Sequence, residues 1–429
     1  MKRRCVNLVT RNWENGIYAL RRLNPDVHLF YQSKNDAKEV TEINAMDSAA
    51  SAADDSKKTK RSSCPRMRSL RRLPRPIARF DPSPAGLWIN DGLEWFELLG
   101  PRRSESRVVN ANVAGDTVLY DADEGIIFNL PSLHEPKGSN PVCLSITHPD
   151  AEEDALYVMD RYPGRASTGG PGMPSCFEVL EYRPSSRYLD DSMKGWGWRA
   201  LPPPPFIHEH GYEPTRITSY AAVGDGTTLC ISSDRNGIGT YCFDTVKGNV
   251  STVTITRPRC RCAKNPRPRH LGHWALPFYD KSEYVPEFKL WLGFSPPRPN
   301  YLCAADLSTM DHGQRPVVHH VWEDLDRPEE EDWVPTHFRI LNLGSGKFCI
   351  AKIISAEATG MKFSVLTGIE MVRGKDDQSR SDTEAGHPPM TKNNHGNTVS
   401  VHECVCRSDT EAGHPPMTAY ISDRFQHTR

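Results

Sequence analysis

Cys260, Cys262, His270 and His273 are the residues of this sequence whose types could hold a metal ion. Thiolate sulfur and imidazole nitrogen are the ligands that zinc prefers. One residue separates the two cysteines and two separate the histidines, and both gaps are shorter than those of ordinary zinc sites. Six Lys or Arg between positions 257 and 269 would also repel a cation. We therefore favour a basic surface loop and keep the four residues as weak metal candidates.

The other sequences that could do chemistry have plainer interpretations. Gly344-Ser345-Gly346-Lys347 has Phe348 where a phosphate loop needs Ser or Thr, so we expect a β-hairpin turn there. The runs 208–210 and 319–320 contain histidines, but a third ligand lies near neither of them in the sequence. The sequence contains no Gly-x-Ser-x-Gly motif. We expect no catalytic residues, no cofactor and no enzymatic activity.

The most prominent basic tract is Lys57, Lys58, Lys60 and Arg61, within a stretch of ten Lys or Arg at 57–79. Short basic clusters of this kind are nuclear-import or nucleic-acid-binding candidates, and a solvated linker is the plain alternative. Aromatic residues do not interleave with the tract, which argues against stacking on single strands. We name the four residues as a possible nuclear-import signal and regard nucleic acid as an unlikely partner.

The composition favours a folded body joined to polar segments. The chain has 429 residues, 37% hydrophobic residues and a net charge of -1, which gives no global attraction to nucleic acid or to a membrane. No apolar run is long enough for a signal peptide or a membrane helix. The 12 cysteines are scattered, and we expect buried free thiols in a reducing compartment. These features predict an intracellular protein of the cytoplasm, the nucleus or both.

The chain divides into four segments by composition. Residues 1–33 contain two short strands that we expect to join the main body. Residues 34–75 are rich in Ala, Ser, Asp and Lys and read as a disordered basic linker. The body spans 76–372, and 373–429 is a mostly disordered tail. That tail holds an exact repeat, RSDTEAGHPPMT, and one possible closing strand at 397–404.

Three elements recur inside the body and decide the predicted fold. A glycine hairpin turn occurs at Gly115, Gly224 and Gly344, and we expect these turns to be equivalent. A strand that closes on Leu-Pro occurs at Leu130, Leu201 and Leu276. Apolar strands end in an aspartate, which starts a turn by bonding the backbone two residues on, at Asp121, Asp160, Asp244 and Asp306. This order predicts an all-β, kelch-like β-propeller of five or six blades, with a disordered linker and tail.

Several stretches also resemble a large family of proteins from cereal grasses that is catalogued only as a domain of unknown function. They include residues 119–123, 177–182, 198–206, 239–245, 302–307 and 344–351. The resemblance implies a kelch-like propeller and supplies no catalytic residues.

Three functions are compatible with the sequence. The leading hypothesis is a non-catalytic scaffold that binds an unknown protein partner, because propellers present variable loops on two faces. An enzyme with its site in the propeller channel is the first alternative. A nucleic-acid binder that uses segments 57–79 and 257–269 is the second.

The two N-terminal strands, at 5–10 and 17–23, are expected to close the ring. A lone hairpin of that size is not stable in water, so it needs a sheet to join. The apolar alternation of 397–404 makes that segment the expected neighbour of residues 6–9.

Overall fold

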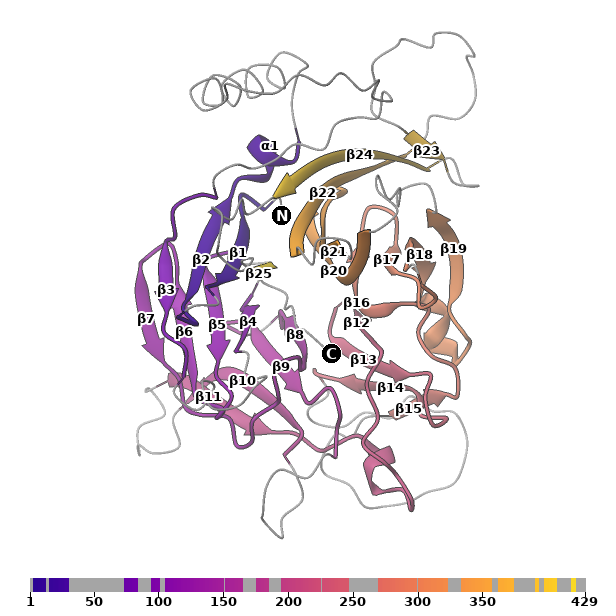
Figure 1. Ribbon diagram of the computed structural model, residues 1–429. Coiled ribbons are helices and arrows are strands. Elements are labelled where there is room, and N and C mark those ends of the chain that lie inside the picture. The colour runs from indigo at the N-terminus through magenta and orange to yellow at the C-terminus, as the bar shows by residue number, and fades with distance from the viewer. Residues whose placement is uncertain are drawn as a thin grey trace, which may run out of the picture.

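Short antiparallel strands recur along the chain and form sheets that stand around a common axis (Figure 1). This computed structural model describes residues 3–12, 15–30, 73–83, 94–100, 105–149, 151–164, 175–184, 194–224, 226–246, 269–298, 300–322, 333–356, 362–373, 390–392, 397–406 and 418–421. The strands of these residues form six sheets when the two halves of one eight-stranded sheet are counted separately. We call the sheets blades one to six, because the architecture is that of an all-β propeller.

The first three blades contain four strands each. Blade one has, in order, β25 (Thr418–Ile421), β1 (Val6–Arg11), β2 (Tyr18–Leu23) and β3 (Ala78–Phe80). Blade two has β4 (Trp95–Leu98), β5 (Arg107–Ala111), β6 (Thr117–Asp121) and β7 (Ile126–Asn129). Blade three has β8 (Val142–Ile146), β9 (Ala155–Met159), β10 (Phe177–Pro184) and β11 (Lys194–Ala200).

The last three blades complete the ring. Blade four has β12 (Ser219–Val223), β13 (Thr228–Ser233), β14 (Gly239–Asp244) and β15 (Arg269–Gly272). Blade five has β16 (Tyr279–Val285), β17 (Leu290–Phe294), β18 (Leu302–Asp306) and β19 (Val317–Trp322). Blade six has β20 (Trp333–Gly344), β21 (Lys347–Ala356), β22 (Lys362–Arg373), β24 (Asn397–Cys406) and β23 (Met390–Lys392). The described helices are single turns: α1 (Pro25–His28), η1 (Pro205–His208) and η2 (Ser308–His312).

The strands nearest the axis include β4, β8, β12, β16, β20 and, in blade one, β25 (Figure 1). Two of them, β12 and β16, pair in parallel over three residues and so join blades four and five into one sheet. The other strand pairs of the described residues are antiparallel, as short turns between consecutive strands require.

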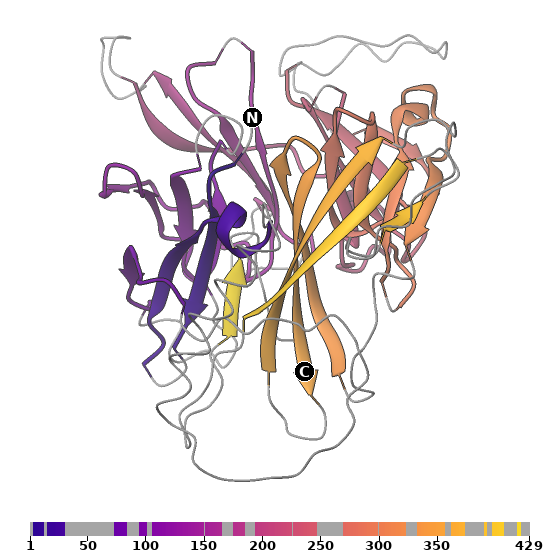
Figure 2. The ribbon, with the colours of Figure 1, turned by 90° about the horizontal axis from the view of Figure 1, so that it is seen from above.

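The ring closes between the two ends of the chain. β1 pairs with β2 on one side and with β25 on the other, so the N-terminal strands lie inside blade one. The predicted closing strand was wrong, because β24 pairs with β22 along ten residues and β25 takes the edge of β1. Figure 2 shows the orange and yellow strands of blade six between the indigo strands of blade one and the salmon strands beyond.

Each junction between neighbouring blades contains apolar side chains. Separate buried clusters lie between blades two and three, three and four, four and five, and five and six. A further cluster joins blades six, one and two, where Leu341 and Leu366 share a core with Val6, Leu20 and Phe96. Because apolar burial is the main stabilising term in folding, this layer between every pair of blades holds the ring together.

The repeated aspartates and Leu-Pro pairs mark real blade positions. Asp121, Asp244 and Asp306 end the third strands of their blades, and their Oδ1 atoms accept backbone N–H bonds from residues 123, 246 and 308 at 2.8–3.1 Å. The buried Leu130, Leu201 and Leu276 each follow a fourth strand and lead into the next blade. Asp160 forms the same turn, at 2.9 Å, but after a second strand.

The glycine turns are not equivalent, contrary to the prediction. Gly224 and Gly344 connect first and second strands, whereas Gly115 connects the second and third strands of blade two. Each has a positive φ, from 57° to 91°, which explains the residue type but not the position in the blade. The turn at Gly344 is the expected hairpin, between β20 and β21.

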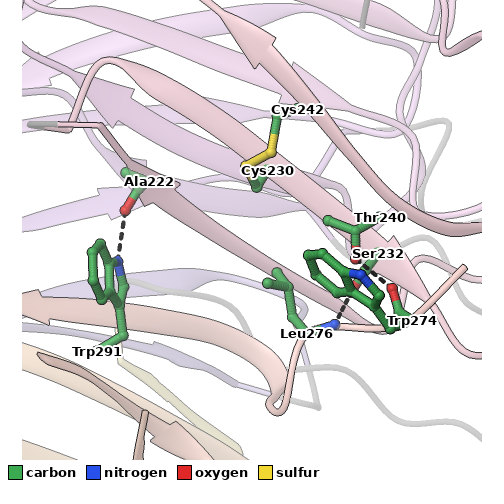
Figure 3. Close-up of a disulfide and its surroundings, with 8 residues drawn as sticks. All are labelled: Ala222, Cys230, Ser232, Thr240, Cys242, Trp274, Leu276 and Trp291. Carbon is green, nitrogen blue, oxygen red and sulfur yellow. Dashed lines mark hydrogen bonds between the residues drawn. A yellow bond between two sulfur atoms is a disulfide. The ribbon is translucent and has the colours of Figure 1, made fainter. Parts of the chain in front are cut away.

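The cysteines depart from expectation at one place. Cys230 and Cys242 lie opposite each other on β13 and β14 and form a disulfide inside blade four (Figure 3). Their place as a directly facing cross-strand pair brings the two sulfurs together. Cys5, Cys176 and Cys303 are free thiols in the described part of the chain.

The predicted linker at 34–75 lies almost entirely outside the described residues, as does much of 373–429. What is described of that last segment includes β23, β24 and β25, so the propeller extends beyond residue 372. Within the described part of the chain, no helix has the length and apolar character needed to cross a membrane.

Candidate functional site

Charged side chains near the axis form ion pairs with one another. Asp280, on β16, is buried, and its Oδ1 accepts a bond from Nη2 of Arg161 at 2.9 Å. Its Oδ2 accepts a bond from Nη1 of Arg339 on β20. Burial raises the pKa of Asp280, but the two guanidiniums outweigh it and hold that pKa well below its usual range. One carboxylate thus connects blade five to blades three and six.

Further ion pairs lie within and between blades. Lys281 on β16 is 3.2 Å from Glu283 and 3.9 Å from Glu97, which belongs to β4 in blade two. Glu178 on β10 is fully buried and accepts a bond from the equally buried Lys137, which lies in the connection between blades two and three. These charges are satisfied by other protein groups, so we assign them a structural role.

Three of the described thiols lie in surroundings that disfavour the thiolate form. Burial is the main cause that raises the pKa of Cys5, Cys176 and Cys303 to about 12. A cysteine attacks as its thiolate, and at neutral pH these three side chains stay protonated.

A cavity lies on the rim, between the loop that leads into blade four and the outer strands of that blade. Its volume is about 650 Å³. We call it the rim pocket. It is lined by Pro205, Phe206, Glu209, His210, Gly211, Tyr212, Glu213, Asn236, Gly237, Ile238, Tyr241, His270 and His273. Three separate segments therefore build one site.

Aromatic rings form a continuous file along the rim pocket. The ring centroids of Tyr212 and Phe206 are 5.4 Å apart, and those of Phe206 and Tyr241 are 5.0 Å apart. The file continues from Tyr241 to His270 and from His270 to His273, each at 4.8 Å. Such tilted and edge-to-face contacts hold the rings in fixed orientations.

Hydrogen bonds brace the loops around this file. The hydroxyl of Tyr212 donates to the carbonyl of Pro163 at 2.8 Å and accepts from the backbone N–H of Thr215 at 3.3 Å. Nδ2 of Asn236 donates to Oγ1 of Thr215 at 2.8 Å, which joins the turn of blade four to the incoming loop. Asn236 itself has a positive φ of 53°, which this residue type tolerates. The rim pocket is therefore preformed by its own polar contacts.

The charged residues of the rim pocket are acidic. Glu209 and Glu213 are exposed at its edge, and neither Lys nor Arg is among the lining residues. The pKa of Tyr241 is raised mainly by burial and further by the negative charge of Glu209. The charge of Glu209 is therefore close enough to influence the ionisation of Tyr241.

The structure brings together two of the four weak metal candidates. His270 and His273 both line the rim pocket, with their rings in contact, while Cys260 and Cys262 lie outside the described residues. No group of three or more His, Cys, Asp or Glu in the described part of the chain is arranged to hold a metal ion. The possible nuclear-import residues Lys57, Lys58, Lys60 and Arg61 also lie outside the described residues.

Most of the rim pocket was not predicted from the sequence. Glu209 and His210 belong to the run 208–210, which was interpreted as surface residues, and Phe206, Tyr212 and Tyr241 were not predicted as site residues. One feature of the sequence could have indicated the rim pocket. The stretch from 202 to 214 is rich in aromatic residues and proline and is long for a connection between propeller strands.

Comparison with known proteins identifies a family but no curated relative. The model of the family described as "Protein of unknown function (DUF1668)" matches residues 3–396. No curated protein matches the chain.

Two of the solved structures that the chain resembles are distant in sequence. The computationally designed Ika8 protein is 10% identical, with a TM-score of 0.29 and coverage of 72% of this chain and 70% of its own. The WD40 domain of SCAP from fission yeast is 10% identical, with a TM-score of 0.26 and 77% coverage of each chain. These likenesses are too distant to bear on function, and the fold is established by the sheets described above.

Proposed function

The chain belongs to the DUF1668 family of proteins of unknown function, and we propose that it is a non-catalytic scaffold that binds a protein partner. The observation that supports this proposal is a contrast between two regions. The charges near the axis are paired within the protein, whereas the rim pocket offers exposed carboxylates beside aromatic rings. Concave sites with aromatic walls and a few polar groups are the usual form of a binding site.

The position of the rim pocket favours a peptide segment as the ligand. It is built from connecting loops and an outer blade edge, which are the parts of a propeller that vary without disturbing its core. Aromatic residues are enriched where proteins bind proteins, because one ring supplies apolar area and, in tyrosine, a polar group. The site is also reachable from the outside, since His210, Glu213 and His270 are exposed.

Selection from a library of displayed random peptides, with the full chain immobilised, tests this proposal. We expect one or more enriched peptide families that bind the full chain in solution by fluorescence anisotropy. The variant His210→Trp, which places a bulky ring at the rim pocket, should abolish that binding. The matched control His208→Trp changes an exposed histidine of the same loop that does not line the cavity, and it should bind normally.

Two results would count against the proposal. The first is a selection without any enriched family. The second is binding that survives His210→Trp, since the ligand would then occupy a different surface.

A further inference from the structure

We propose that the rim pocket recognises an arginine side chain in an otherwise extended peptide, an inference that rests on the proposed protein-binding function. The first observation is charge. Among the described residues that line the cavity, Glu209 and Glu213 are the formally charged ones besides the histidines, and both are exposed. Arg235, in the neighbouring turn, is exposed and does not line the cavity. The described lining therefore offers complementary charge to a cationic ligand.

The second observation is the aromatic wall. Phe206, Tyr212 and Tyr241 lie in the ring file of the rim pocket. Phe206 and Tyr241 are buried, so Tyr212, which is half-buried, is the ring of these three that a ligand can reach. A guanidinium is flat, stacks on aromatic faces and bonds a carboxylate through two parallel N–H donors. An ammonium group offers a point charge without that planar match. The combination of rings and carboxylates in one cavity thus favours arginine over lysine.

The third observation is size and rigidity. A volume of about 650 Å³ exceeds what one side chain needs and lies within the range of small-molecule sites. It suits the arginine together with its flanking residues. The bonds of Tyr212 and Asn236 hold the walls before any ligand arrives, which lowers the entropic cost of binding.

The peptides enriched on the full chain are the probes for this inference. In each, every arginine is replaced in turn by citrulline, which keeps the shape and loses the charge, and by lysine. We expect one arginine whose replacement by citrulline weakens binding about tenfold or more, as loss of a charged contact should. Replacement of the same arginine by lysine should give an intermediate loss.

The protein side of the test is the double variant Glu209→Gln with Glu213→Gln. It should weaken binding of the arginine peptide by a similar factor and leave binding of the citrulline peptide unchanged. The attraction that is lost needs both the carboxylates and the guanidinium charge. Glu124→Gln is the matched control, an exposed glutamate in the turn after β6 of blade two, and it should change neither affinity.

The outcomes separate this inference from the proposed function. Enriched peptides that bind at the rim pocket without arginine, or that tolerate citrulline everywhere, overturn the arginine inference alone. A preference for lysine over arginine overturns it as well. An absence of enriched peptides overturns the proposed function itself.

Discussion

Asp280 shows how one residue can fix the relation between blades. It has a positive φ of 65°, it is buried, and its carboxylate binds Arg161 of blade three and Arg339 of blade six. Its backbone N–H donates to the carbonyl of Thr218 at 2.7 Å, beside the inner strand of blade four. Four blades therefore meet at this residue.

The variant Asp280→Asn tests that role without changing the backbone, because asparagine also tolerates a positive φ. It removes the charge and leaves two guanidiniums buried without compensation. We expect a loss of about 3–5 kcal/mol in the free energy of unfolding, the usual cost of breaking a buried ion pair from one side. Urea unfolding measures this. The exposed Asp234→Asn is the control and should change little, and an equal stability of both variants would refute the assignment.

The buried Glu178 predicts a dependence of stability on pH. Burial raises its pKa, but Lys137 and His134 outweigh that effect and lower the pKa overall. A carboxylate with a lowered folded pKa contributes stability that is present above its unfolded pKa of about 4.3 and is lost as the pH falls through the folded value. The urea midpoint should therefore drop on acidification below about pH 5.

Glu178→Gln is the matching variant. It should be less stable than the parent at pH 7, and its midpoint should depend less steeply on pH below 5. If the curves of parent and variant run parallel from pH 7 to pH 3, Glu178 does not carry this dependence.

At the residue scale the sequence predicts local chemistry better than assembly. The aspartate turns follow from a side chain that bonds its own backbone, and the structure contains all four. The rim pocket joins residues near 209, 237 and 270, which are far apart in the sequence. Their proximity depends on how blade four folds and how the loop before it packs. No local pattern encodes that, so His270 and His273 were considered only as metal ligands.

At the scale of elements, the repeats located the blades and misplaced one turn. Leu-Pro pairs follow the fourth strand in three blades, because proline cannot continue a hydrogen-bonded ladder. Glycine turns lack this positional meaning, since any tight hairpin needs a positive φ. Gly115 therefore has the right conformation at the opposite end of its blade.

The predicted closing strand shows a similar limit of prediction from the sequence. Apolar alternation predicted a strand at 397–404, and β24 covers that stretch. Alternation identifies a strand but not the edge that it joins. β24 pairs with β22 over all ten of its residues, while β25 supplies the short partner that β1 needs.

Truncation after residue 417 tests the role of β25. It should lower the melting temperature of the whole propeller and leave the edge of β1 open, so that the protein dimerises or aggregates with concentration. Calorimetry and light scattering measure both effects. Truncation after residue 421, which keeps β25, is the control. Identical melting of the two truncated chains, with both monomeric, would show that β25 does not close the ring.

At the scale of the molecule, six apolar junctions make the blades one cooperative body. The ring begins at β1 and ends at β25, so the first and last of the described strands share a blade. The predicted all-β propeller is confirmed, and its described strands give six blades, the larger of the two numbers expected. The order of the repeats made the ring predictable, whereas the chain's late strands carry no such repeat.

Localisation remains a prediction from the sequence. Lys57, Lys58, Lys60 and Arg61 form a dense basic cluster in a polar segment, and we expect them to direct part of the protein to the nucleus. Replacement of all four by alanine should shift a fluorescent fusion to the cytoplasm. Replacement of Arg102, Arg103, Arg183 and Arg315 in the same way is the control and should leave the distribution unchanged. An unchanged nuclear fraction after replacement of the four residues would contradict this prediction.

Hydrogen exchange of the full chain, with and without a saturating enriched peptide, tests the central claim that binding occurs at the rim. The account predicts slower exchange in the segments 205–213, 236–241 and 270–273, because a ligand in the rim pocket covers and rigidifies them. The inner strands β12, β16 and β20 should exchange as before. Protection confined to those inner strands would place the ligand at the axis and contradict the assignment of the rim pocket as the binding site.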